Sequence, residues 1–146
     1  MMRYEGKVEF DAGRAKVYSF ITNPASIVTI VPDVVESKVV DGDHFTVKAK
    51  AGVGPIRGTI DFAFTIAEKE EGRRATLVGK GKGMQSTIDL TMKMEMEDAQ
   101  DGCVAKWVAE AQVGGTMAGI GARLIGGIAE KYVRQVTDNL AKAASA

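Results

Sequence analysis

The sequence has 146 residues, of which 45% are hydrophobic and 26% charged, and its 19 basic residues balance its 19 acidic ones. This length and composition are typical of one soluble globular domain spanning residues 1–146. The zero formal net charge gives no basic surplus for nucleic-acid binding, and the single cysteine excludes an intramolecular disulfide. The N-terminus lacks the apolar core of a signal peptide, and no stretch approaches the roughly 20 apolar residues of a transmembrane helix, so a cytoplasmic protein is expected.

The first elements are a strand and two short helices. Residues 3–10 alternate between apolar and polar side chains, which predicts a half-buried strand. At residues 14–22, the apolar residues recur at helical spacing, which predicts a first short helix. Asn23 and Pro24 then supply the N-cap and first position of a second helix, which is expected to reach about Ile30.

The middle of the chain is a series of strands in which apolar residues recur at every second position. They are expected at residues 34–40, 44–53, 58–68, 75–83, 86–98 and 103–113, separated by turns such as Gly54-Pro55. Short connections favour antiparallel neighbours, and a single apolar face on each strand requires cover on one side only. The sequence therefore predicts a curved seven-stranded antiparallel sheet.

Residues 113–140 have the spacing of a long helix, which is the element available to cover the sheet. Its first half contains Gly119, Gly121, Gly126 and Gly127, which would cost roughly 4 kcal/mol of helix propensity relative to alanine. One interpretation is a gate that opens locally. The other is a surface of small residues that allows close backbone packing. Gly121 falls within the apolar stripe, where it would leave a gap.

A single helix about 11 Å wide is too narrow to fill the concave side of such a sheet, so an internal cavity is expected. The candidate lining residues are Phe20, Phe62, Phe64, Leu77, Gly79, Gly81, Met92, Met94, Trp107, Met117, Ile120, Gly121 and Leu124. Alternation cannot distinguish a hollow interior from a filled one, so the methionine row is equally consistent with ordinary core. A lone inward tryptophan such as Trp107 is more often part of the core than of a pocket. The two inward glycines, Gly79 and Gly81, indicate either free space or a bend in the sheet.

Four stretches carry a resemblance that covers essentially the whole chain: NPASIVTIVPDV, VGPIRGTIDF, GKGKG and AQVGGTMAGIGARLIGGIAEKY. They resemble the G-subunit family of carbon monoxide dehydrogenase, within the START/Bet v 1-like (SRPBCC) superfamily. The resemblance implies the α+β helix-grip fold and a non-enzymatic accessory protein that handles a quinone or lipid and serves a molybdenum hydroxylase at the membrane. Many members continue into an apolar tail, whereas this sequence ends at KAASA, which favours a soluble carrier.

Other functions remain as alternatives. The superfamily includes cyclases and dehydratases, but no acid, base or nucleophile is recognised among the inward positions apart from tyrosine hydroxyls. A ligand-free assembly protein is the third possibility. With one histidine, His44, no metal site is expected, and no cofactor is expected beyond a bound quinone or lipid. Four lysines could contact anionic lipid peripherally or simply form a solvated face: Lys48, Lys50, Lys80 and Lys82.

Overall fold

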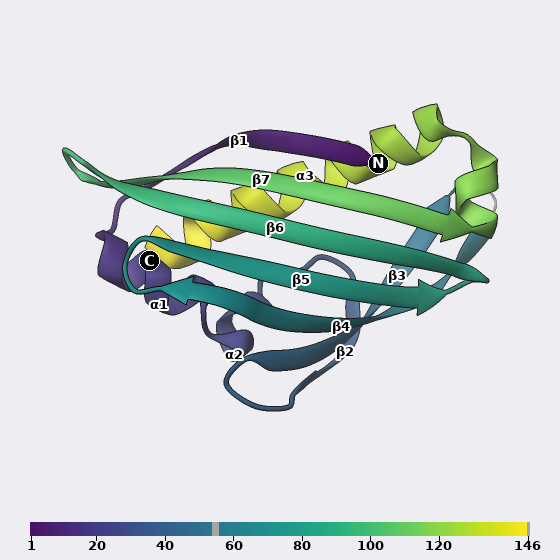
Figure 1. Ribbon diagram of the computed structural model, residues 1–146, viewed down its shortest axis with the longest axis horizontal. Helices are drawn as coiled ribbons and strands as arrows, with labels where there is room; N and C mark the ends of the chain where they lie inside the picture. Colours follow the sequence, from purple (N-terminus) through teal and green to yellow (C-terminus); the bar gives the residue numbers. More distant parts are fainter. Residues whose placement is uncertain (54–55, 146) are drawn as a thin grey trace.

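The computed structural model describes residues 1–53 and 56–145, and it shows a long helix lying along one face of a curved sheet (Figure 1). The strands are β1 (Met2–Phe10), β2 (Val34–Val39), β3 (His44–Val53), β4 (Ile56–Glu70), β5 (Arg74–Gly83), β6 (Ser86–Ala99) and β7 (Gly102–Gly115). The helices are α1 (Arg14–Ile21), α2 (Pro24–Ile27), the 3₁₀ helix η1 (Thr116–Ile120) and α3 (Ala122–Ser145). The predicted turn at Gly54-Pro55 lies outside the described residues.

The seven strands form one antiparallel sheet in the order β1-β7-β6-β5-β4-β3-β2. Each hairpin connects sequence neighbours, except that β1 pairs with β7 because the helices α1 and α2 carry the chain across to the far edge. The predicted fold class is confirmed: this is the α+β helix-grip arrangement.

The two short helices form where the sequence predicts them. Asn23 caps α2, since its Oδ1 accepts a hydrogen bond of 3.1 Å from the backbone N–H of Ala25. The helix ends at Ile27, earlier than the expected Ile30, and the chain continues through hydrogen-bonded turns. This places α2 beside β3 and β4, where Ile27 packs against Phe45.

The buried residues form three hydrophobic clusters instead of one continuous core. The first joins β1, β7, α1 and the end of α3, and includes Val17 and Leu140. The second joins α2, β3 and β4 around Phe45, and the third joins Ile60, Met117 and Ile125. A compact domain usually has one contiguous core, so three clusters indicate an interior that is not completely filled.

Aromatic rings fill the space over the inward glycines of β5, which corrects the expectation that these glycines leave room. Gly79 and Gly81 pair directly with Phe64 and Phe62 of β4. A Cβ atom at Gly79 would lie 2.5 Å from Cε1 of Phe64, and one at Gly81 would lie 2.6 Å from Cε1 of Phe62. Nor do the glycines mark a β-bulge in this pairing, since the register shift lies elsewhere, between Ile66 and Glu68. Their function is to seat the neighbouring rings, as in other sheets where an aromatic residue covers a glycine.

We therefore expect Gly79→Ala to destabilise the fold. The new methyl group would force the ring of Phe64 away from its stacked neighbour Phe45, whose centroid is 5.0 Å away. Overpacking of this kind costs about 1–3 kcal/mol, which urea denaturation would measure. Ala63→Val, on the exposed face of β4, is the control and should change stability by less than about 0.5 kcal/mol. An unchanged denaturation midpoint for Gly79→Ala would show that the ring moves freely.

The prediction of one continuous helix over the glycine-rich segment is wrong. Strand β7 continues to Gly115, η1 follows, and α3 begins only at Ala122 after Gly121, whose φ is 122°. The segment is held by the β5–β6 turn: the backbone N–H of Thr116 donates to the carbonyl oxygen of Gln85, and that of Met117 donates to Oγ of Ser86. Of the four glycines, Gly126 and Gly127 lie within the α-helix α3, and Gly119 lies in the short 3₁₀ helix η1, so the cost in α-helix propensity is about 2 kcal/mol.

Candidate functional site: an apolar cavity beneath the long helix

A cavity of about 360 Å³ lies between α3 and the concave face of the sheet. Residues from all three hydrophobic clusters border it, including Leu140, Phe64 and Ile125. Its volume falls in the usual range of about 300–1,000 Å³ for small-molecule sites. The cavity is therefore the space that the three clusters leave between them.

Most of the predicted lining residues border this cavity. The ones that do are Phe20, Phe62, Phe64, Leu77, Met92, Met94, Trp107 and Met117. Within the methionine row, Met92 and Met94 border the cavity, whereas Met96 is buried in the first cluster. Met96 is therefore ordinary core, whereas Met92 and Met94 line the cavity. Side chains fill the space beneath one end of the sheet and leave a cavity beneath its middle. That these residues bind a ligand stays a prediction.

The remaining predicted residues do not border the cavity. The rings of β4 cover Gly79 and Gly81. Because α3 begins only at Ala122, Leu124 lies in its first turn and is 45% exposed, and Gly121 is also exposed, with no atom within 4 Å of the position of a Cβ. Ile120 packs beside the third cluster without reaching the cavity. The errors at Ile120, Gly121 and Leu124 follow from extending an α-helical register through a segment that is not α-helical.

Sequence reasoning missed several cavity residues. They are Ile27, Ile30 and Val31 around α2, Ala109 and Ala111 on β7, and Ile128, Ala129, Val133 and Val136 on α3. The residues on β7 could have been found because they alternate with Trp107 along the strand, and those on α3 because they lie on the same side of the helix as Ile125. Those around α2 could not, since the position of α2 depends on tertiary packing.

Two tyrosines tie α3 to opposite edges of the sheet. On β1, the hydroxyl of Tyr4 donates to the carbonyl oxygen of Gly126 at 3.1 Å. On the other side, the hydroxyl of Tyr132 lies 3.3 Å from the carbonyl oxygen of Lys50 on β3 and 3.4 Å from Oδ2 of Asp33. Burial, followed by the negative charge of Asp33, raises the pKa of Tyr132, so its hydroxyl stays protonated as a donor. Tyr132 itself borders the cavity, as do Lys50 and Gly52, which are exposed. On the β3 side, exposed residues therefore border the cavity.

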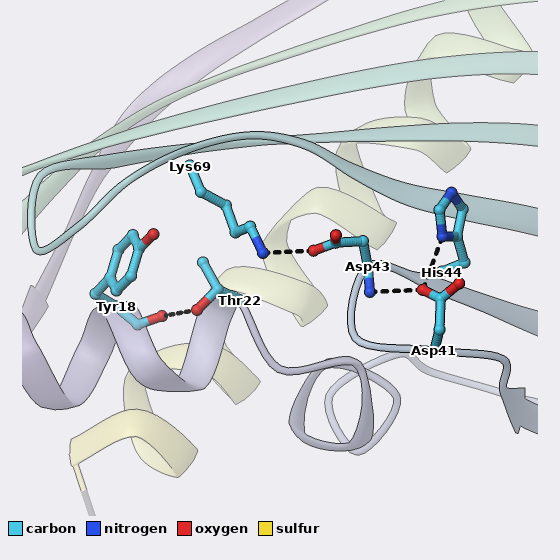
Figure 2. Close-up of polar contacts among 6 residues, drawn as sticks. All are labelled: Tyr18, Thr22, Asp41, Asp43, His44 and Lys69. Carbon is cyan, nitrogen blue, oxygen red and sulfur yellow. Dashed lines mark hydrogen bonds and ion pairs between the residues drawn. The ribbon is translucent and has the colours of Figure 1, made fainter.

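A polar cluster lies on the β2–β3 turn (Figure 2). Nδ1 of His44 is 2.8 Å from Oδ1 of Asp41, which also accepts from the backbone N–H of Asp43, and these contacts lower the pKa of Asp41, the backbone bond most. Asp43 pairs with Lys69 of β4, and this hydrogen bond raises the pKa of the lysine. The groups are partnered and stand apart from the cavity. No set of three or more potential ligands within the described residues could hold a metal ion.

Acidic neighbours accompany part of the predicted lysine patch. Lys48 lies 4.0 Å from both Glu36 and Asp61, and Lys80 lies 3.3 Å from Asp89. Opposite charges on the same face favour the interpretation as a solvated surface. In the part of the chain that the structure describes, no helix is long and apolar enough to cross a membrane.

Solved structures with the same fold cover nearly the entire chain. A conserved protein from Geobacillus kaustophilus shares 18% identity with a TM-score of 0.86, and the match covers 99% of this chain and 95% of that one. Ara h 8.0201 matches with 14% identity, a TM-score of 0.64, and coverage of 98% and 97%. A START superfamily protein from Mycobacterium smegmatis matches with 10% identity, a TM-score of 0.64, and coverage of 98% and 94%. At these identities, the likeness shows the fold alone.

The family assignment comes from the sequence over nearly its full length. No curated protein matches this sequence. The family model for the G subunit of carbon monoxide dehydrogenase (CoxG) matches residues 6–145, from β1 to the end of α3. The residues that border the cavity lie inside the match, apart from Met2 and Tyr4. The chain therefore belongs to the CoxG family, the G-subunit family of carbon monoxide dehydrogenase.

Proposed function

We propose that this protein is a carrier that holds a long, neutral, apolar molecule, such as a quinone or a lipid, in the cavity beneath α3. The observation that carries the proposal is the cavity itself, about 360 Å³ of space bordered by side chains that are almost all hydrocarbon. The charged residues at its border, Lys50, Lys93 and Glu110, occupy positions that alternate toward the outer face of the sheet. Burying apolar surface there would supply the binding free energy.

The family name supports a role beside a carbon monoxide dehydrogenase. We propose that the protein serves a molybdenum hydroxylase of that type as an accessory protein, on the cytoplasmic side and peripheral to the membrane. An apolar redox molecule is nearly insoluble in water, so an enzyme that is not embedded in the bilayer would need a carrier of this kind.

Ligand binding should raise the melting temperature. With a short-chain prenylated naphthoquinone at about 100 times its Kd, binding would add about 2.7 kcal/mol to the free energy of unfolding. For a domain of this size, that corresponds to an increase of about 5–10 °C, measured by calorimetry. Native mass spectrometry of protein purified from its own organism would identify the bound molecule. If neither quinones nor lipids shift the melting temperature, the carrier proposal is wrong.

We also propose that the chain has no catalytic activity of its own. General acid–base chemistry needs a positioned proton donor or acceptor, and the two tyrosine hydroxyls at the cavity already hydrogen-bond to protein groups. No turnover is expected with ester, thioester or polyketide-like substrates. An enzymatic rate that disappears in Tyr132→Phe would instead establish the cyclase or dehydratase alternative.

A further inference from the structure

Trp107 carries the polar atom that the fold leaves without a partner. Among the buried side-chain nitrogen and oxygen atoms of the described residues, its Nε1 is the one with no hydrogen bond. Buried donors are nearly always paired, because an unpaired donor loses its bonds to water without replacement. An exception at the border of a cavity indicates a partner that is not part of the protein.

The position of the indole follows from the glycine opposite it. Trp107 on β7 pairs with Gly6 on β1, and a Cβ atom at Gly6 would lie 2.8 Å from Cζ2 and 3.2 Å from Nε1 of the ring. The N–H edge therefore rests over Gly6, and the side chain borders the cavity. Because the buried N–H rests over Gly6, donating to a bound molecule requires the indole to turn about χ2 toward the cavity that it borders.

Protein groups and water are poor partners for this donor. The nearby tyrosine hydroxyl on β1, that of Tyr4, already donates to Gly126 and is not bonded to the indole. The first cluster, to which the indole belongs, also contains the hydroxyl of Tyr18, which is not bonded to the indole either. The further half-buried members of this cluster include Met94 and Val136, which offer a thioether and hydrocarbon. A buried water needs two to four polar partners, and these surroundings do not provide them.

We propose that the Trp107 N–H donates a hydrogen bond to an acceptor oxygen of the bound molecule. The cavity would then select neutral apolar molecules that carry a carbonyl, such as quinones, ketones or esters, over hydrocarbons of the same shape. This inference rests on the proposed carrier function. The oxygen-bearing end lies at β7, and the apolar remainder extends across Met92 of β6 and Leu77 of β5, the next strands of the sheet.

A matched pair of ligands tests the inference. The first is 2-methyl-3-farnesyl-1,4-naphthoquinone, and the second is the naphthalene of the same skeleton without the two oxygens. Trp107→Phe should weaken quinone binding about 3- to 10-fold, the range for loss of one neutral hydrogen bond, and should change naphthalene binding less than about 2-fold. For each ligand, the affinity of the unmodified protein is divided by that of the variant. Because each ratio refers to one ligand, the different hydrophobicity of the two ligands cancels when the ratios are compared, as in a double-mutant cycle. Isothermal titration calorimetry measures all four affinities.

Two controls keep the test decisive. Met94→Leu, a volume-conserving change at the same part of the cavity, should affect both ligands equally. Because the chain has one tryptophan, biosynthetic replacement by benzothienylalanine changes only this site and keeps the ring shape without the N–H, which replaces the phenylalanine variant if that does not fold. In the unmodified protein, the indole N–H band in the ultraviolet resonance Raman spectrum should shift with the quinone and not with the naphthalene.

The outcomes distinguish a failure of this hydrogen bond from a failure of the carrier function. Equal weakening of both ligands by Trp107→Phe, with no Raman shift, would show that Trp107 only packs and would overturn the inference while leaving the carrier function intact. If neither ligand binds the unmodified protein, the carrier function itself fails.

Discussion

Ala109→Trp is expected to abolish ligand binding while leaving the protein folded. Ala109 is half-buried on β7, borders the cavity, and lies between Tyr4 of β1 and Met92 of β6. An indole at this position would occupy a large part of the space of about 360 Å³. We expect the affinity for a prenylated naphthoquinone to fall about 100-fold or more, which corresponds to about 2.7 kcal/mol.

The matched control is Ala63→Trp. Ala63 is exposed on β4 and lies between Thr46 and Lys80 on the outer face of the sheet. The substitution places the same side chain on the same sheet but outside the cavity, so the affinity for the naphthoquinone should not change. Circular dichroism and the melting temperature establish that both variants are folded. Undiminished binding by folded Ala109→Trp would place the ligand elsewhere on the protein.

The strands could be predicted well because one physical cause dominates them. A sheet that is covered on one side needs apolar residues at every second position, and β6 shows this alternation with little interruption. The same pattern correctly placed Leu77 and Trp107 on the inner face. Periodicity alone does not provide the connections or the cavity. The antiparallel order was expected from the short connections and the cavity from the width of the helix, and the family resemblance implied the same helix-grip fold.

Contacts between side chains in the interior were harder to predict than which residues point inward. Periodicity indicates that Gly79 points inward, but it does not indicate that Phe64 of the next strand covers it. That contact depends on the register between β4 and β5, and a shift of one residue would have moved the ring to the other face. Once a register is known, a glycine directly opposite a phenylalanine is a recognisable signal.

The glycine-rich segment was mispredicted because its hydrogen-bond partners are distant in sequence. Local spacing favours a helix after Gly115, yet the donors of Thr116 and Met117 are satisfied by the β5–β6 turn, about 30 residues earlier in the chain. Gly115 itself approaches that turn so closely that a Cβ atom would overlap the carbonyl oxygen of Gln85. A tertiary contact therefore determines the conformation of this segment, although its local sequence pattern favours an α-helix.

Two glycine substitutions only six residues apart should have opposite effects on stability. At Gly121, φ is 122°, a conformation that side chains rarely adopt, so Gly121→Ala should destabilise the protein by about 1–3 kcal/mol. Gly127 lies inside α3, so Gly127→Ala should stabilise it by about 1 kcal/mol through helix propensity. A Cβ atom would meet nothing within 4 Å at either position, so contacts do not confuse the comparison.

Urea denaturation of the two variants measures the difference directly. If a continuous helix began at Gly115, both alanines would stabilise the protein, and that result would contradict the break before α3. The break also bears on ligand exchange, because Met117 and Ile125, on either side of it, both border the cavity. The gate over residues 115–126 stays a prediction, and it now has a structural basis other than a weakened helix. If this segment opens, its amides should exchange with solvent faster than those of residues 128–140, because it consists of η1 and the first turn of α3, whereas residues 128–140 lie within the continuous hydrogen-bonded turns of α3.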